Sequence, residues 1–294
     1  MKKEDYIFIP GKNKKLLEYS TKANVNSITK LEAKVLLEQS KAVLSDLQNK
    51  LFAQAKHALL IVIQGVDAGG KDSIIKKVFS DINPHGYRVA SFKSPSEEEL
   101  VHDYLWRCNK ELPARGCMAI FNRSYYEEVL IVRVHEGILK KQNLPNFSSA
   151  LHKDDKFWMQ RMTDMVNYEN YLINNGIQVL KVYLHISKDE QKRRFLNRIN
   201  LPEKNWKFAL SDIEDRRFWD FYMEIYEKTF NVTSTKQAPW HIVPGDDKWF
   251  ARLILSQLIV DKLEGLKLQL PELTEKKIIQ LKDAKEMLEN GELK

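Results

Sequence analysis

The sequence predicts an α/β fold in which a parallel five-stranded sheet lies between two layers of helices. Two observations lead to this prediction. Five short apolar runs alternate along the chain with longer amphipathic segments, as strands joined by helical crossovers do. The first and fourth runs, "HALLIVIQG" and "GIQVLKVYLHI", are almost continuously apolar, which is typical of strands buried on both faces.

Each expected element has its own signal. The strands are expected at 57–65, 87–92, 116–121, 176–186 and 238–244. The helices are expected at 28–56, 71–82, 94–112, 152–174, 188–199, 211–230 and 246–263. A Ser or Thr followed three residues later by Glu marks four of the helix starts: Thr29–Glu32, Ser96–Glu99, Ser187–Glu190 and Ser211–Glu214.

The chain divides into three parts on this interpretation. Residues 1–56 form an N-terminal extension, with a polar arm over about 25 residues and then a helix that packs on the core. Residues 57–265 form the α/β core, and residues 266–294 form a charged, helical C-terminal tail. A chain of 294 residues with 43% hydrophobic side chains can bury a sizeable core.

Composition narrows the classes of function. Lys and Arg exceed Asp and Glu by 47 to 40, and the net charge of +7 suits an anionic ligand but also an ordinary basic surface. Cys108 and Cys117 have no metal-ligand spacing, so we expect reduced thiols in a cytoplasmic protein. The chain start lacks a secretory apolar region, and no run of about 18 apolar residues predicts a membrane span.

The stretch "LLIVIQGVDAGGKDS" resembles a phosphate-binding loop between a strand and a helix. Gly65, Gly70 and Lys71 fit the pattern G-x-x-x-x-G-K. Backbone N–H groups of such a loop, with the dipole of the following helix, surround phosphate oxygens, and the lysine adds a point charge. Gly65, Ala68, Gly69 and Gly70 are therefore predicted to contact phosphate; the alternative is a tight turn that binds no ligand.

Two acids depart from the usual pattern. Asp72 stands where a Ser or Thr normally holds Mg²⁺. Asp67, inside the loop, would repel phosphate unless a cation lies between them, which predicts Mg²⁺, or Mn²⁺ in its place, at Asp67. A carboxylate there is also a candidate to accept a proton from an attacking phosphate. Asp72 opens a helix, where an acid is favourable whatever the function, so a structural role is favoured for it.

The third strand ends on "FNRSYYEE", which should reach the same edge of the sheet as the loop. Asn122 occupies a position where enzymes with a phosphate-binding loop of this kind commonly have an acid that binds the metal. Glu127 or Glu128 is a candidate for the missing charge, although both could be ordinary helix charges. Arg123 is predicted to point into the crevice, and Arg133 is either a phosphate ligand or a surface residue.

The stretch "QKRRFLNRINLPEKNWKF" predicts a mobile lid over about 194–214. Arg194 and Arg198 are four residues apart and share a helix face that leads into a polar interruption with Lys204 and Lys207. A solvated basic helix is the alternative. His185 follows a strand and is interpreted as a packed side chain.

Several of these motifs together resemble the polyphosphate kinase 2 family, over about residues 28–265. They include "GVDAGGKD", "LPARGCMAIFNRSYYEEVLIVRVH", "PEKNWKF" and "APWHIVPGDDKWFARL". The resemblance implies a P-loop kinase fold similar to thymidylate kinase, with a helical lid. It also implies Mg²⁺-dependent, reversible phosphoryl transfer between inorganic polyphosphate and nucleotides. Asn122 followed by "RSYYE" is similar to the class III subgroup, which phosphorylates AMP and ADP.

The resemblance assigns roles residue by residue. Lys71 and the loop glycines would bind the transferring phosphates, Asp67 would act at the metal, and Arg123 would stabilise the moving group. Arg194 and Arg198 would belong to the lid, and Asn122 and Glu127 would lie near the acceptor and the metal. Lys76, Lys77, Lys93 and Arg133 are candidates for a basic channel that admits the polymer. The implied partners are polyphosphate, AMP, ADP, ATP and further copies of the chain, as a dimer or tetramer.

Two other functions stay open from the residues alone. An ATP-dependent nucleoside monophosphate kinase would normally have Ser or Thr after the loop lysine, and Asp72 counts against it. A non-catalytic P-loop protein that binds nucleic acid is compatible with the charge of +7. The clustered arginines of the expected lid favour phosphate transfer instead, so nucleic acid is not an expected partner.

Overall fold

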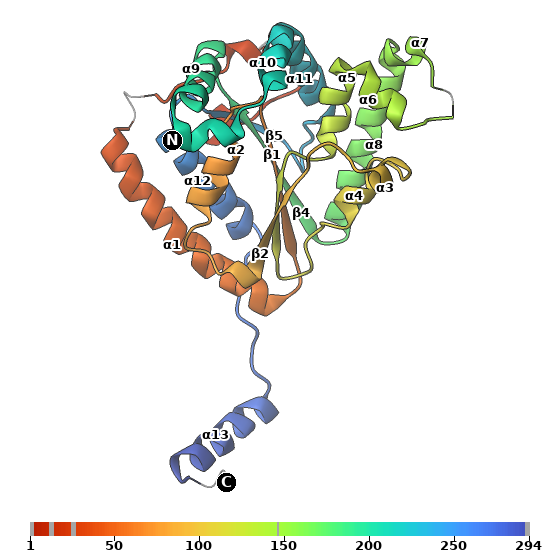
Figure 1. Cartoon of the computed structure of the whole chain (residues 1–294). Helices are drawn as coiled ribbons and strands as arrows, with labels where there is room; N and C mark the ends of the chain where they lie inside the picture. Colours follow the sequence, from red (N-terminus) through yellow and green to blue (C-terminus); the bar gives the residue numbers. More distant parts are fainter. Residues whose placement is uncertain (1–2, 12–14, 25–27, 146, 292–294) are drawn as a thin grey trace.

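The computed structural model describes residues 3–11, 15–24, 28–145 and 147–291, and its centre is a five-stranded sheet. All strand pairs are parallel and their order is β2-β3-β1-β4-β5, which confirms the predicted α/β fold (Figure 1). The strands are β1 (Ala58–Gln64), β2 (Tyr87–Ser91), β3 (Met118–Asn122), β4 (Ile177–His185) and β5 (Trp240–Pro244).

Helices cover both faces of the sheet. The longer ones are α1 (Lys30–Gln54), α2 (Lys71–Val78), α8 (Asp155–Asn174), α9 (Lys188–Asn200), α11 (Trp219–Thr233), α12 (Lys248–Glu264) and α13 (Glu275–Glu289). The shorter ones are α3 (Glu97–Leu100), α4 (Trp106–Asn109), α5 (Ile131–Val134), α6 (Glu136–Lys141), α7 (Ser149–His152) and α10 (Leu210–Asp215). No helix in the described part of the chain is long and apolar enough to cross a membrane.

Alternate residues of each strand enter two separate hydrophobic clusters, because successive side chains of a strand point to opposite faces. Leu60 and Val62 of β1 pack in one cluster with side chains of α8 and α11. Leu59, Ile61 and Ile63 pack in the other, with side chains of α1, α2 and α12. β1 is therefore buried on both faces, as its continuous apolar run predicted.

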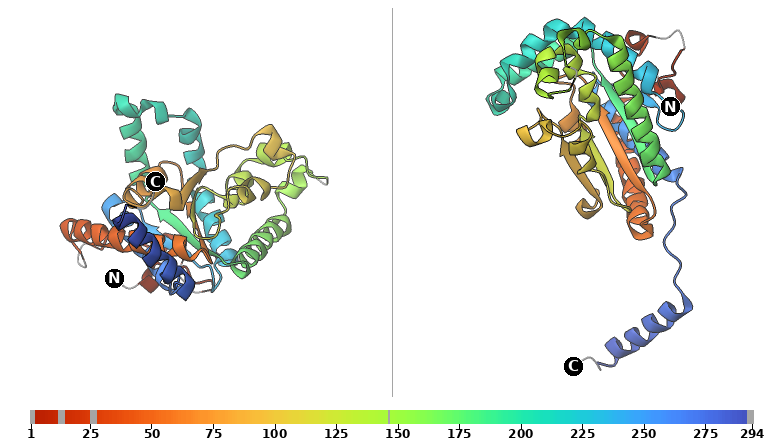
Figure 2. Two further views of the ribbon diagram at one scale, coloured as in Figure 1. Left: turned by 90° about the horizontal axis from the view of Figure 1, so that it is seen from below. Right: turned by 90° about the vertical axis from the view of Figure 1, so that its right-hand side faces the viewer.

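The N-terminal segment lies against the body of the protein and is more than a polar cover. Phe8 and Leu16 are buried, and Ile7 forms an isolated antiparallel bridge with His241 of β5. The capping box of α1 is confirmed: the Glu32 N–H donates to Thr29 Oγ1, and the Thr29 N–H donates to Glu32 Oε2 (2.7 Å). At the other end of the chain, α13 projects away from the body on an extended linker (Figure 2).

Three details of the helix predictions are wrong. The single helix expected over 94–112 is two short helices, α3 and α4, because the cap at Ser96 starts a helix that ends after one turn. The cap expected at Ser211 lies inside α10, whose N-cap is Ala209. The helix after the glycine loop ends at Val78. Capping signals located helix starts better than helix ends, since ends depend on packing partners elsewhere in the chain.

Candidate active site

The glycine loop lies at the carboxyl end of the central strand, between the ends of β3 and β4. In the sheet register Ile63 of β1 pairs with Asn122, and Gln64 pairs with Tyr183. The predicted meeting of the loop with "FNRS" and "HIS" at one edge is therefore observed. A parallel sheet binds ligands at this edge because its helices begin there.

The loop adopts the compact turn that its glycines allow. Gly70 has φ +97°, a left-handed conformation that side chains disfavour, and it caps α2 directly before Lys71. A Cβ at Gly69 would lie 2.7 Å from the Val66 carbonyl oxygen, and the Gly69 N–H donates to that oxygen (3.0 Å). Ala68 is also left-handed, with φ +59°. The loop thus places the N-terminus of α2 beneath the crevice, where an anion would bind.

Lys71 is buried and folds back over the loop. Its Nζ donates to the carbonyl oxygens of Gly65 (2.5 Å) and Val66 (3.2 Å). Burial lowers the pKa of Lys71, and the nearby charge of Arg123 lowers it further. A phosphate would give this ammonium group the anionic partner that the two neutral carbonyls do not.

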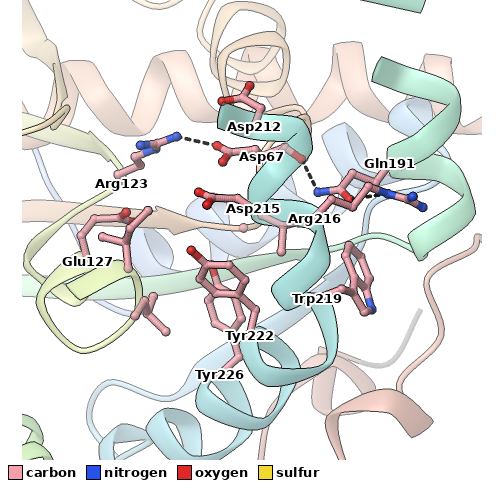
Figure 3. A pocket seen from close by; sticks show the side chains of 14 residues that line it. Asp67, Arg123, Glu127, Gln191, Asp212, Asp215, Arg216, Trp219, Tyr222 and Tyr226 are labelled. Atoms are coloured by element: carbon pink, nitrogen blue, oxygen red, sulfur yellow. Dashed lines mark hydrogen bonds and ion pairs between the residues drawn. The ribbon is translucent and has the colours of Figure 1, made fainter. Parts of the chain in front are cut away.

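Asp67 and Arg123 form an ion pair across the mouth of the crevice. Arg123 Nη2 donates to Asp67 Oδ1 at 2.5 Å, and the side chains are 34% and 24% exposed for Arg123 and Asp67 (Figure 3). Glu127 lies on the same side. Burial raises the pKa of Glu127, although Arg123 and Lys71 act to lower it. Glu127 lies on a 3₁₀ turn, Tyr125–Glu128, where a helix was expected.

Asn122 and Asp72 contact one another. Asn122 Nδ2 donates to Asp72 Oδ1 (2.7 Å), and Lys207 Nζ lies 3.4 Å from Asp72 Oδ2. Burial acts to raise the pKa of Asp72, but these two contacts outweigh it and hold the pKa below its usual range. Asp72 therefore does more than begin a helix. Through its two contacts it links the segment between α9 and α10, which carries Lys207, to the end of β3.

A pocket opens beside the loop and contains residues that the sequence reasoning missed. Asp212 and Asp215 of α10 line it together with Asp67, Arg123 and Glu127 (Figure 3). Further lining residues from α9 and the segment after α10 are Gln191, Arg216, Trp219, Tyr222 and Tyr226. Both acids belong to the "SDIEDRRFWDFY" stretch, where nothing in the local spacing distinguishes them from ordinary helix charges.

The carboxylates of this pocket are crowded. Burial raises the pKa values of Asp212 and Asp215, and the charge of Asp67 raises both further, against the opposing effects of Arg198 and His135 respectively. Among the described residues, no three His, Cys, Asp or Glu side chains are grouped so as to hold a metal ion alone.

The two arginines of the expected lid have different environments. Arg194 is buried: its Nη1 donates to the Ala68 carbonyl (3.1 Å) and its Nη2 to the Gly245 carbonyl (2.5 Å). Its Nε donates to Glu190 Oε1 (2.6 Å). Arg198 is partly exposed and pairs with Asp212 (3.1 Å). Arg194 therefore braces the loop against the end of β5, while Arg198 contacts an acid of the pocket.

Several predicted residues lie outside the pocket lining. Arg133 pairs with Asp155 at the start of α8 and lies over the Trp158 ring. Lys204 is exposed on a 3₁₀ turn between α9 and α10. Lys76, Lys77 and Lys93 are exposed as well. Their phosphate-binding roles stay predictions.

A second cavity lies on the other side of the 3₁₀ turn. Glu128 faces it, one residue after Glu127. Arg161 Nη2 donates to Gln142 Oε1 (2.6 Å), and its guanidinium lies 4.9 Å from the centre of the Tyr104 ring. The Tyr104 hydroxyl is buried and has no hydrogen-bond partner in the part of the chain that the structure describes. The remaining lining residues include Arg107, Glu99, Leu144, Phe157, Gln160 and Asp164.

Comparisons with known proteins agree on one family. The sequence model described as "Polyphosphate kinase 2 (PPK2)" matches residues 27–271. The ADP-polyphosphate phosphotransferase of Rhodopseudomonas palustris is 52% identical over 231 residues, which are 79% of each chain. The AMP/ADP-polyphosphate phosphotransferase of Meiothermus ruber is 43% identical over 242 residues, 82% of this chain and 84% of the relative.

A solved structure extends this similarity to the fold. The crystal structure of polyphosphate kinase 2 from Arthrobacter aurescens TC1 superposes with a TM-score of 0.80 at 37% identity. The superposition covers 90% of this chain and 89% of the other. The predicted fold, with its loop at the end of a central parallel strand, is confirmed.

Proposed function

Because the chain belongs to the polyphosphate kinase 2 family, we propose that it transfers phosphoryl groups reversibly between inorganic polyphosphate and AMP or ADP. The observation that carries the proposal is the ion pair of Asp67 and Arg123 beside the buried Lys71. Phosphoryl transfer requires positioned charges more than covalent chemistry, and these three side chains supply charges of both signs at one end of the loop.

Different residues would bind the phosphate donor and the phosphoryl group that is transferred. The N–H groups of the loop and the start of α2 bind phosphate oxygens. Lys71 exchanges the carbonyls of Gly65 and Val66 for a phosphate oxygen, a stronger acceptor because it is charged. Arg123 is paired with Asp67 and lies within the electrostatic influence of Glu127, and it neutralises charge on the moving group. Arg198 of α9, which pairs with Asp212 of α10, adds a further positive side chain.

Mg²⁺ fits the acids of the pocket. Asp67 raises the pKa values of Glu127, Asp212 and Asp215, so the carboxylates repel one another and a divalent cation would relieve the repulsion. Mg²⁺ commonly takes one or two carboxylates and completes its shell with phosphate oxygens and water. Asp67 and Glu127 would hold it, with the Asn122 carbonyl oxygen as a neutral neighbour. When bound, the ion would neutralise phosphate charge; Mn²⁺ has similar ligand preferences.

The second cavity suits the nucleoside of the acceptor. Its charges are mixed, with Arg107 and Arg161 facing Glu99 and Glu128, so it does not favour a polyanion. Aromatic walls and a few polar groups are typical of sites for small planar rings. Glu127 lines the pocket beside the loop and the next residue, Glu128, lines this cavity, so the proposal is that one nucleotide spans both, with its base here and its phosphate at the loop.

The deciding experiment mixes the protein with AMP, Mg²⁺ and polyphosphate in the absence of ATP. We expect ADP and then ATP to form, detected by chromatography. If no nucleotide product forms, while ATP and AMP give ADP, the chain is a nucleoside monophosphate kinase and the proposal fails. Tight nucleic-acid binding with no transfer under any of these conditions would support the non-catalytic alternative.

Two further expectations belong to this proposal. A dimer or tetramer is expected, and light scattering on the full chain measures it. The helix α13 carries exposed Ile278, Leu281 and Leu288, whose spacing of three and seven residues places them on one side of the helix as an apolar face for such contacts. A cytoplasmic location is the other expectation, and fractionation of cells tests it.

A further inference from the structure

The turn after β3 carries two residues of the pocket in an unfavourable backbone conformation. Arg123 has φ +66°, in the left-handed region that a residue with a long side chain seldom adopts. Glu127 follows four residues later on the 3₁₀ turn Tyr125–Glu128. A strained conformation persists only where the surrounding structure holds it, so the contacts that fasten this turn bear on the site.

On the side of β1, the turn is held by ordinary hydrogen bonds. The Arg123 N–H donates to the Ile63 carbonyl (3.1 Å). Ser124 Oγ accepts from the Tyr126 N–H (3.1 Å) and from Gln64 Nε2 (3.0 Å). These contacts fix the start of the turn, but they do not involve the side chains of Tyr125 and Tyr126.

Beneath the sheet edge, two phenols fasten the turn to a buried charge. Tyr125 and Tyr126 both donate to Glu169 Oε1, at 2.9 and 2.7 Å. Glu169 belongs to α8 and is 1% exposed. The Tyr126 ring also packs edge-on against Trp240 of β5, with centroids 4.8 Å apart. The two consecutive tyrosines thus connect the turn to α8 and to β5.

The counter-charge is Lys181 of β4, which is fully buried. Its Nζ donates to Glu169 Oε2 (2.6 Å), to the Thr233 carbonyl (2.6 Å) and to the Tyr126 hydroxyl (3.2 Å). All three N–H groups of the ammonium are therefore used. Burial lowers the pKa of Lys181, and Glu169 opposes that change.

A buried ion pair is weak ground for stability, because well-packed apolar residues often replace one without loss. Apolar contacts, unlike hydrogen bonds, do not fix the orientation of the groups that they join. Here the hydrogen bonds of the pair end on the two tyrosine hydroxyls of the turn and on the Thr233 carbonyl at the end of α11. We infer that Lys181, Glu169 and Tyr126 are positioning residues that hold Arg123 and Glu127 in their active geometry. Only the activity measurement in the test below depends on the proposed function.

The test removes one hydroxyl. Tyr126→Phe keeps the ring and deletes the group shared by Glu169 and Lys181. The matched control is Tyr183→Phe in β4, because Tyr183 is also fully buried and, among the described residues, its hydroxyl donates to the Met223 sulfur (3.8 Å) and has no contact with the turn. We compare amide hydrogen exchange at the N–H groups of Arg123 and Glu127, which donate to Ile63 and Ser124. No substrate is needed for this measurement.

In Tyr126→Phe, exchange at the two amides should be at least tenfold faster, while Tyr183→Phe leaves it unchanged. The kcat should fall at least tenfold, with KM for AMP and for polyphosphate within twofold. In an Arg123→Ala background, adding Tyr126→Phe should lower kcat by a smaller factor than it does in the wild type, because one of the two positioned residues is gone.

Equal exchange in Tyr126→Phe and wild type, or equal acceleration in the two Tyr→Phe variants, overturns the inference. An unchanged kcat in an active enzyme does the same. If Tyr126→Phe does not fold, Glu169→Gln replaces it, since the amide retains the shape and loses the charge. A wild-type protein without polyphosphate activity refutes the proposed function, and the exchange data then decide the inference alone.

Discussion

Replacing Arg194 by lysine separates two roles that this residue could have. Its guanidinium donates to the Ala68 carbonyl of the loop, to the Gly245 carbonyl after β5 and to Glu190 of α9, with a longer fourth contact to the Asp246 carbonyl (3.5 Å). Lysine retains the charge but has a single nitrogen, which cannot reach both carbonyls and the carboxylate together. Arg194→Lys therefore removes the brace between the loop and β5 without removing the positive charge.

The expected loss follows from the two carbonyl contacts. A hydrogen bond from a charged donor contributes about 1.5 to 3 kcal/mol, so losing two costs at least about 3 kcal/mol. Unfolding entropy of about 2.1 cal/mol/K per residue gives roughly 0.6 kcal/mol/K for 294 residues. The melting temperature of Arg194→Lys should fall by about 5 °C.

Circular dichroism during heating measures this shift, and Arg198→Lys is the control. Arg198 has one partly exposed ion pair, which lysine can retain, so its variant should melt within about 2 °C of wild type. A melting temperature for Arg194→Lys within 1 °C of wild type, together with lost transfer, would mean that Arg194 binds phosphate and does not brace the loop.

Three further predictions concern the metal, the acceptor and pH. Asp67→Asn should fold normally and lower kcat about 100-fold with a raised Mg²⁺ requirement, and near-normal rates would remove Asp67 from the site. Tyr104→Phe should raise KM for AMP about two- to tenfold without changing KM for polyphosphate; equal KM values would place the nucleoside elsewhere. Burial lowers the pKa of His185 to about 4, below the unfolded value of about 6.5, so the unfolded chain binds the extra proton and acid destabilises the fold. Between pH 7 and pH 5 this costs about 2 kcal/mol, and urea unfolding of His185→Phe should lose about that much less than wild type; an unchanged difference would refute the assignment.

The sequence was sufficient for much of the fold because the relevant signals are local. Continuous apolar runs identified the buried strands β1 and β4, and alternation with helices indicated a parallel sheet. The pattern around Gly70 and Lys71 located the loop, since the left-handed turn before α2 requires a glycine at that position. The edge at which Asn122 meets the loop followed from topology, because parallel strands end on the same side.

Local signals failed where a residue's role depends on a distant partner. Ser211 resembled a cap, but α10 starts at Leu210 after Ala209. Arg194 and Arg198 were grouped as one basic face, yet Arg194 is buried against Ala68 and Gly245 while Arg198 pairs with Asp212. Spacing along a helix shows that two side chains share a face, but it does not show which neighbour that face meets.

By itself, the sequence determined the parallel sheet, the phosphate loop and the residues at the end of β3, through patterns that span short windows. Only the tertiary structure decided that Asp212 and Asp215 join Asp67, and that Tyr126 is fastened to Glu169 and Lys181 beneath the site. The physical reason is that burial and charge pairing act through space, between segments that chain folding alone brings together.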